Sequence, residues 1–537
     1  MRPASDLTAD KLRGGYYTPD FVVDACISRA VSLSGRETVS VLEPSAGDGA
    51  FVRGLARSPW AKSASVACVE KSAAAAQKCS DTMRAVGVQG DTVESNFFEW
   101  ATSCDTRFDC VLGNPPFVRY QFVPSEDRVA AERLLEPTQV LAGVSNLYIP
   151  FVLVSLMRLI PGGAFAMVLP SEVLCTTSGE QARAALLAEL EDLQVDLFPR
   201  EAFPDILQDV AVFTGRKRTA SANSGLVRFV EHSVSGTSSW SHRISLSDGK
   251  WTRFLLDDRM LAAIAHGESL SAVHRMAAVA KFSVSIVTGA NAFFAVDRPT
   301  IENHGMSEWA KPLMSRSYDS PGIVFRDADH SAAASSGRPA WLLDFDAQAP
   351  DPETHQGAMR YLRGGEAAGL ATRYKCRIRS PWYRVPHIWP GRLMMSKRAS
   401  LHHRVILNEA SVLTTDTVYR GKMQPEFCDR ERDFVAGFHN SLTLLSSEIE
   451  GRTYGGGVLE LVPSEIARLL VPMLPTNGDL EQLDALSRDA GGQRDADERL
   501  VHETNRLLSR ALPEFAEIAE PLETARQRLR RRRFDEP

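Results

Sequence analysis

The chain has 537 residues, enough for two to four domains and a large buried core. Its composition, 44% hydrophobic and 24% charged, is that of an ordinary globular protein. A formal net charge of −6 argues against a uniformly basic surface, so contact with nucleic acid requires basic residues segregated onto one face.

The N-terminal residues, the apolar runs and the cysteines indicate a cytoplasmic protein without a structural metal. Residues 1–15 lack the apolar region of a signal peptide, and the longest apolar run, residues 147–160, is too short to cross a bilayer and contains Arg158. That run predicts a buried helix. The eight cysteines lie far apart and form no CxxC pair or zinc-spaced cluster, which indicates reduced thiols.

From residue 20 to about residue 215, short apolar runs rich in β-formers alternate with helical patterns. Six runs are predicted strands: Val39–Leu42, Ser65–Val69, Phe108–Leu112, Ala164–Leu169, Val195–Phe198 and Val210–Thr214. The stretch Ala182–Leu193 is predicted as a helix. This alternation predicts a parallel α/β sheet that binds ligands at the carboxyl ends of its strands. The polar stretch Thr219–Gly249 is predicted as a linker or irregular crossover.

The pattern changes after about residue 250. Short irregular strands and frequent Pro, Gly and Trp predict a second, mixed α+β domain over residues 250–475, after a first domain at residues 1–230. From residue 476 to residue 537 the chain is charged and helical, with few large apolar residues. It ends in the basic segment RQRLRRRRFDEP, which is expected to be solvated.

A glycine-bearing turn follows the first predicted strand, in the segment LEPSAGDGAF that begins at Leu42. Gly47 and Gly49 allow the backbone to approach a ligand closely. A GxGxxG fingerprint is absent, so a dinucleotide site is not indicated. The carboxylate of Glu43 at the strand end disfavours a pyrophosphate and suits a ligand that carries an ammonium group.

Two later positions extend this candidate nucleoside site. Glu70 ends the second predicted strand, where a carboxylate can accept hydrogen bonds from both ribose hydroxyls. Asn96 and Phe97 precede the third predicted strand, and an amide beside an aromatic ring can hold an adenine by its edge and its face.

The most specific signal is GNPPF, residues 113–117, directly after the third predicted strand. Two consecutive prolines hold the backbone extended and leave carbonyl groups free to bind a ligand. The side-chain oxygen of Asn114 and the carbonyl of Pro115 can each accept one hydrogen of an exocyclic amino group, which favours a tetrahedral, nucleophilic nitrogen. Phe117 can stack on the base and stabilise the positive charge that develops during methyl transfer.

A basic block lies in the second predicted domain. Residues 373–404 contain nine Lys or Arg and no Asp or Glu, and the cations are interleaved with Tyr374, Trp382, Tyr383 and Trp389. This composition suits phosphate contacts combined with stacking on bases. Arg377, Arg379 and Arg384 are the predicted DNA contacts.

The order of these segments resembles the gamma-class (Taq-like) adenine-N6 DNA methyltransferases. Features of that family's catalytic domain, including YTP at residues 17–19, LEPSAGDGAF, Glu70 and NPPF, occur in order from about residue 14 to residue 215. The resemblance implies a Rossmann-like S-adenosylmethionine-dependent catalytic domain followed by a target-recognition domain. It further implies methylation of N6 of a flipped adenine in duplex DNA, as the modification enzyme of a type II restriction–modification system in a bacterium or archaeon.

The resemblance also implies roles for individual residues. Cofactor contacts are implied for Thr18, Glu43, Ser45, Gly47, Glu70, Asn96, Phe97 and Asn114. Contacts with the target base are implied for Asn114, Pro115, Phe117, Tyr148 of the NLY segment, and Phe203 as a second stacking wall. The family usually has Asp at the position of Asn96, and an amide oxygen can still accept a hydrogen bond from the cofactor's amino group.

Several other functions share part of this pattern. NPPF-type tetrapeptides also occur in protein-glutamine and RNA methyltransferases, but those have small, usually N-terminal accessory domains, whereas about 300 residues follow the catalytic part here. A methylase-like specificity subunit of a phage-defence complex is a further alternative, although NPPF and Glu43 are intact. No PD…(D/E)xK nuclease pattern is evident, so we expect a separate restriction endonuclease as functional partner. We also expect the chain to act on DNA as a monomer.

Overall fold

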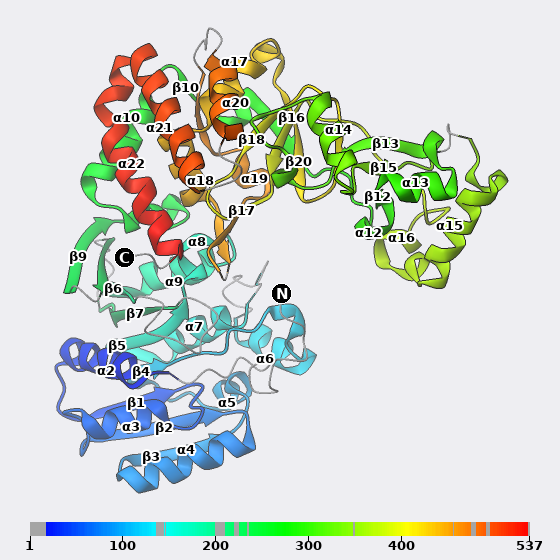
Figure 1. Cartoon of the computed structure of the whole chain (residues 1–537). Coiled ribbons are helices and arrows are strands. Elements are labelled where there is room, and N and C mark those ends of the chain that lie inside the picture. Colours follow the sequence, from blue (N-terminus) through cyan, green and yellow to red (C-terminus); the bar gives the residue numbers. More distant parts are fainter. Residues whose placement is uncertain are drawn as a thin grey trace. The chain divides into compact units, whose positions relative to one another are not determined.

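In a computed structural model, the chain forms two compact units, residues 1–255 and 256–537 (Figure 1). The structure describes residues 18–135, 144, 146–198, 210–219, 225–233, 236–346, 350–454, 456–473, 479–489 and 494–534. The first unit contains one large sheet, and the second contains several small sheets together with the C-terminal helices.

The first unit is built on a nine-stranded sheet in the order β3-β2-β1-β4-β5-β7-β6-β8-β9. Its strands are β1 (Val39–Glu43), β2 (Ala64–Glu70), β3 (Gln89–Glu94), β4 (Phe108–Gly113), β5 (Leu159–Pro170), β6 (Leu190–Leu197), β7 (Val210–Lys217), β8 (Leu226–Ser233) and β9 (Gly236–Arg243). Strands β1 to β5 pair in parallel, and β7 runs antiparallel between β5 and β6. The strand order reverses between β1 and β4, and ligands bind at the carboxyl ends of strands at such a switch point.

Helices pack on both faces of this sheet. They are α2 (Asp20–Ser34), α3 (Ala50–Arg57), α4 (Ala73–Val86), α5 (Phe97–Ser103), α6 (Ser125–Leu135), α7 (Tyr148–Met157), α8 (Glu172–Cys175) and α9 (Glu180–Glu189). Apolar side chains of α2, α3 and α4 form one buried core with those of the parallel strands. The helices α5, α6 and α7 pack in succession elsewhere on the unit. Burial of these apolar faces is the main force that holds the parallel strands together.

All six predicted strands are confirmed, as β1, β2, β4, β5, β6 and β7. Two of the predicted helices extend too far: α9 ends at Glu189 because β6 begins at Leu190, and α7 ends at Met157 because β5 begins at Leu159. In both cases, apolar residues of a buried strand follow the helix without a polar boundary, and periodicity cannot separate the two.

The prediction of a linker at Thr219–Gly249 is wrong. β8 and β9 form a hairpin there, and β8 pairs in parallel with β6, so this segment extends the sheet. The edge strand β3 was not predicted, because its sequence QGDTVE is polar and its side chains are mostly exposed. An edge strand needs backbone pairing on only one side and little apolar burial, which leaves a weak sequence signal.

The described residues of the second unit form four small sheets. Their strand orders are β10-β23, β11-β20-β16-β18-β14, β12-β15-β13-β19 and β17-β22-β21. The strands are β10 (Val273–Arg275), β11 (Ala280–Ser283), β12 (Ala295–Val296), β13 (Ala310–Met314), β14 (Val324–Phe325), β15 (Trp341–Leu343), β16 (Leu393–Ser396), β17 (Arg398–Ala399), β18 (Val405–Asn408), β19 (Leu413–Thr414), β20 (Val418–Met423), β21 (Arg452–Tyr454), β22 (Val458–Glu460) and β23 (Leu470–Pro472).

Helices cover these sheets, and the unit has separate buried clusters. The helices are α10 (Asp258–Ser269), α11 (Met276–Val279), α12 (Asn291–Phe294), α13 (Arg298–His304), α14 (Asp327–Ser335), α15 (Gln356–Ala367), α16 (Tyr374–Arg377), α17 (Glu431–Phe438), α18 (Ser441–Glu450), α19 (Pro463–Ile466), α20 (Asp479–Asp489), α21 (Arg494–Ala511) and α22 (Pro513–Phe534). One large cluster includes residues of α17, α18, α20 and α21, and another includes residues of α12, α13, α15 and α16.

The basic C-terminal segment is not solvated as a whole, contrary to expectation. It forms the end of α22, which packs against α10, α18 and α21. The side chains of Arg526, Arg530 and Arg533 are only 2%, 7% and 2% exposed, and each forms an ion pair with a glutamate. These arginines therefore join α22 to the rest of the second unit.

Within the described ranges, no helix combines the length and apolarity needed to cross a bilayer. The same residues contain no group of three or more His, Cys, Asp or Glu side chains arranged to hold a metal ion.

Candidate functional site

Glu43, at the carboxyl end of β1, is almost completely buried, with 2% of the residue exposed. The thiol of Cys68 lies 3.6 Å from one of its carboxylate oxygens, with the sulfur as donor. Burial raises the pKa of the Glu43 carboxyl well above its usual value. A cationic ligand beside this carboxyl would favour its ionised form, because an opposite charge offsets the cost of desolvation.

The turn after β1 adopts the conformation that its glycines allow. Gly47 and Gly49 have φ values of 55° and 87°, in the left-handed region, and Gly49 caps α3. The space where a Cβ of Gly47 would lie has no atom within 4 Å, whereas a Cβ on Gly49 would come within 3.2 Å of the Thr82 side chain. The two glycines therefore differ: Gly47 borders open space suited to a ligand, and Gly49 lets α4 pack closely against the turn.

Glu70 closes this turn from β2. One carboxylate oxygen accepts the N–H of Gly47 at 2.9 Å, and the other accepts the N–H of Ser72 at 2.8 Å. The carboxylate thus holds the end of β2 against the glycine turn. Each oxygen retains further acceptor capacity, so ribose hydroxyl groups could still bind to it.

Asn114 lies after β4, beside the turn. Its side-chain oxygen is buried and has no hydrogen-bond partner, while its amide nitrogen donates to the hydroxyl of Thr18 at 3.1 Å. Its backbone carbonyl accepts a hydrogen bond from the Ser45 hydroxyl at 3.0 Å. The structure therefore brings Thr18, Ser45 and Asn114 together, and the orientation of the amide leaves an acceptor without a donor. Such an atom is costly to bury unless a ligand supplies the missing hydrogen.

The residues after Asn114 approach the start of α7. The rings of Phe117 and Tyr148 lie 6.4 Å apart at 90°, and the N–H of Leu147 donates to the carbonyl of Val118 at 2.8 Å. Pro115 is buried, and Phe117 is partly buried. Burial raises the pKa of the Tyr148 hydroxyl, which stays neutral. The predicted second wall, Phe203, lies outside the described residues.

Asn96 and Phe97 are more enclosed than the sequence indicated. The ring of Phe97 is 2% exposed and stacks on Phe151, with centroids 5.0 Å apart. Asn96 caps α5, where its side-chain oxygen accepts the N–H of Phe98 at 2.8 Å, and its amide nitrogen donates to Asp127 at 2.6 Å. The contact between the face of Phe97 and an adenine stays a prediction. The burial of Phe97 leaves little of the ring accessible to a ligand.

Two carboxyl groups near this site, the buried Asp127 and the partly buried Glu172, were not predicted. Asp127 of α6 contacts Asn96 and Lys71, and Glu172 of α8 accepts a hydrogen bond from the amide of Asn146 at 2.9 Å. Burial raises the pKa of Glu172. Neither residue belongs to a recognisable motif, and no signal in the sequence indicates that α6 and α8 would bring them here.

Eight of the nine cations in the basic block of the second unit fall into two groups. Arg379, Arg392, Arg398 and Arg404 have partners within the protein: Arg379 donates to the carbonyls of Val287 and Thr288, Arg404 to those of Ser320 and Gly322, and the other two pair with glutamates. Arg373, Lys375, Arg377 and Arg384 are exposed on and near α16, and the paired Arg392 and Arg398 are exposed as well. Trp382 and Tyr383, expected to stack on DNA, are buried in a core cluster, whereas Tyr374 is 63% exposed.

Family comparisons cover both units. Residues 65–201 match the Eco57I restriction-modification methylase family, and residues 248–507 match the C-terminal domain of the type II methyltransferase M.Eco57I. The chain is similar to the Eco57I-type restriction–modification methylases over these two segments. The NPPF segment and the basic block lie within the respective matches. The similarity to Eco57I-type methylases thus extends from the large sheet into the second unit.

Individual relatives of the chain are distant. It is 22% identical over 380 residues to the type II methyltransferase M.AccI of Acinetobacter calcoaceticus, a match that covers 67% of this chain and 68% of the relative. It is 24% identical over 236 residues to M.BanIII of Aneurinibacillus aneurinilyticus, covering 40% of each. These matches indicate a methyltransferase of the restriction–modification type.

Solved structures show the shared fold. The type IIL restriction-modification enzyme MmeI, solved in complex with DNA, matches with a TM-score of 0.59 at 11% identity, over 98% of this chain and 80% of MmeI. The DrdV–DNA complex matches with a TM-score of 0.52 at 11% identity, over 90% and 58%. The predicted fold class, a methyltransferase α/β sheet followed by a mixed C-terminal domain, is confirmed.

Proposed function

We propose that the chain transfers a methyl group from S-adenosylmethionine to N6 of an adenine flipped out of duplex DNA. The buried, unpartnered side-chain oxygen of Asn114 carries this proposal, because it is an acceptor that lacks a hydrogen donor at the switch point of the sheet. An exocyclic amino group supplies such a donor. The gamma-class assignment and the pairing with a separate nuclease of a type II system are part of the same proposal.

Residues around the β1 turn fit the cofactor. Glu43 is a buried carboxyl suited to the ammonium group, the open space at Gly47 admits a ligand close to the backbone, and Glu70 has capacity left for ribose hydroxyls. Thr18 and Ser45 orient Asn114 at the boundary between the cofactor and the base. When bound, S-adenosylmethionine supplies an electrophilic methyl group on its sulfonium.

The chain's own residues then activate the amine. Its lone pair is delocalised into the purine ring, so it is a poor nucleophile in the planar form. Acceptance of its two hydrogens by the Asn114 oxygen and the Pro115 carbonyl would draw the nitrogen toward a tetrahedral geometry. Phe117 would stack on the base and stabilise the positive charge that develops on it. The T-shaped contact with Tyr148 holds the Phe117 ring in place.

Acidification is expected to weaken S-adenosylmethionine binding. Burial raises the pKa of Glu43, so the carboxylate takes up a proton at a higher pH than an ordinary carboxylate does. Protonation removes the charge that pairs with the ammonium group. Affinity should be highest above that raised pKa and fall as the pH passes below it. Titration calorimetry between about pH 8 and about pH 5 tests this. Glu43→Gln should bind weakly with little pH dependence, and an identical pH profile in both proteins would contradict the assignment.

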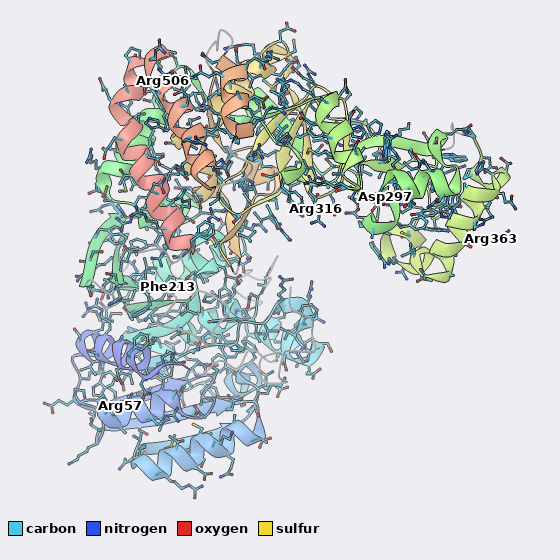
Figure 2. The ribbon with its side chains drawn as sticks, in the orientation of Figure 1. Arg57, Phe213, Asp297, Arg316, Arg363 and Arg506 are labelled. Atoms are coloured by element: carbon cyan, nitrogen blue, oxygen red, sulfur yellow. The ribbon has the colours of Figure 1, made fainter. Side chains whose placement is uncertain are left out.

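The second unit is the proposed DNA-binding part. Duplex DNA must be held by its backbone while a base is extruded, and the exposed cations on and near α16 suit phosphates. The helices α15 and α16 both pack against residues 370–372, and Arg363 of α15, labelled in Figure 2, is another exposed arginine there. Arg379 is the least suited of the three predicted contacts, because its guanidinium holds two backbone carbonyls.

Neutralising Arg377 and Arg384 together is expected to lower the salt dependence of DNA binding. Each lost phosphate contact should reduce the log–log slope by about 0.9, so the double variant should lose about 1.8. Fluorescence anisotropy with a labelled duplex at several salt concentrations measures the slope. Arg392→Gln is the matched control, since Arg392 already pairs with Glu431. A slope that is unchanged in the double variant would place the DNA on another surface.

Incubation with tritiated S-adenosylmethionine and, separately, DNA, RNA and protein tests the function directly. Label in N6-methyladenine from DNA alone is expected. Label in RNA or in glutamine would support the alternative methyltransferase classes, and absence of label with retained DNA binding would favour a specificity subunit.

A further inference from the structure

Asp127 is a buried carboxylate beside the candidate cofactor site. It lies on α6, is 7% exposed, and its two oxygens have different partners: the amide nitrogen of Asn96 at 2.6 Å and the ammonium of Lys71 at 2.5 Å. Lys71 directly follows Glu70, and Asn96 caps α5 after β3. Asp127 therefore joins the two loops that follow β2 and β3, at the same edge of the sheet.

The contact with Asp127 determines the orientation of the Asn96 amide. A carboxylate can only accept, so it selects the NH₂ end of Asn96, while the N–H of Phe98 selects the oxygen end at 2.8 Å. Both neighbours require the same orientation. A flipped amide would place oxygen against oxygen and NH₂ against N–H. The remaining acceptor capacity of the Asn96 oxygen is thus held in one direction.

We propose that Asp127 is a positioning residue for the adenine half of the cofactor. Asp127 holds the Asn96 amide so that the Asn96 oxygen accepts a hydrogen bond from the 6-amino group of the adenine. This rests on the proposed use of S-adenosylmethionine. The contact between Asp127 and Lys71 ties the same carboxylate to the loop of Glu70. The buried Asp127 side chain thereby couples the ribose contact of Glu70 to the adenine contact of Asn96. Specificity for the 6-amino group of the adenine depends on Asp127.

Binding of two nucleosides to the full chain tests this by calorimetry. S-adenosylhomocysteine carries the 6-amino group, whereas S-inosylhomocysteine carries a carbonyl there, which would face the Asn96 oxygen. The wild-type protein should prefer the first by about tenfold or more, since an acceptor left without a donor is costly. In Asp127→Ala the preference should fall at least about threefold, because the amide is free to turn. Glu126→Gln, an exposed neighbour on α6, is the control and should keep the full preference.

The outcomes separate the two proposals. If the wild-type chain binds neither compound, the proposed function fails. If it binds and discriminates but Asp127→Ala discriminates equally well, only the role of Asp127 is overturned. A purely structural loss in the variant would weaken both compounds in proportion and leave the ratio unchanged, so it also counts against the proposal.

Exchanging the amide and the carboxylate between positions 96 and 127 provides a test that does not require Asp127→Ala to fold. Asn96→Asp alone places two carboxylates about 2.6 Å apart and should weaken S-adenosylhomocysteine binding about tenfold or more. Adding Asp127→Asn restores an amide–carboxylate pair with the roles exchanged, and affinity should return to within about threefold of the wild-type value. A double variant that binds no better than Asn96→Asp alone would overturn the proposal.

Discussion

Replacing Asn114 with alanine is expected to lower kcat on duplex DNA by about 100- to 1,000-fold, the effect of removing one acceptor or donor aimed at a developing charge. The reason is specific to this site: the Asn114 oxygen is buried without a partner, so its interaction is available to the substrate amine. Cofactor affinity should stay within about tenfold, because the lost interaction strengthens chiefly in the transition state. Single-turnover methylation and calorimetry with S-adenosylhomocysteine measure the two quantities.

Thr18→Val is the matched control for this variant. It removes the hydroxyl that receives the Asn114 amide hydrogen at 3.1 Å but leaves the unpartnered oxygen in place. We expect a smaller loss of kcat than in Asn114→Ala, because only the orientation of the amide is relaxed. If Asn114→Ala retained more than about a tenth of the wild-type kcat, the proposed activation of the amine would be wrong.

Replacing Arg533 with methionine is expected to destabilise the second unit by about 3–5 kcal/mol, the cost of leaving a buried partner charge uncompensated. The Arg533 and Glu448 side chains are 2% and 6% exposed and are joined at 2.9 Å and 3.1 Å. The same guanidinium donates to the carbonyls of Gly457 and Leu401. Its removal therefore leaves a carboxylate and several backbone acceptors without donors.

Hydrogen exchange of peptides from α18 and α22 reports this loss locally, which matters because a chain of two units need not unfold in one step. Arg531→Met is the control: Arg531 is exposed in the same helix, and its loss should change stability by less than about 0.5 kcal/mol. Adding Glu448→Gln to Arg533→Met should recover part of the stability. Equal protection in the Arg531 and Arg533 variants would show that the buried pair is not what holds α22.

The sequence by itself determined the features that depend on neighbouring residues. β1 with its glycine turn, and β4 with the NPPF segment, follow from apolar runs of strand length that end in residues with restricted or unusual backbone freedom. Their parallel order then places both turns at one edge of the sheet, since strands joined by helical crossovers must run in the same direction. The location of the candidate site could therefore be predicted before any contact was known.

Only the tertiary structure decided which polar groups are partnered. Arg379 and Arg533 carry the same charge as Arg377, yet the first two are bound to carbonyl or carboxylate groups far away in the sequence, and Arg377 is exposed. Asn96 and the Asp127 with which it pairs are 31 positions apart in the sequence, with α5 and β4 between them. The physical reason is that the state of a charge or an amide depends on what long-range packing places against it. Backbone preferences, in contrast, are set within a few residues, and they are what a single sequence displays.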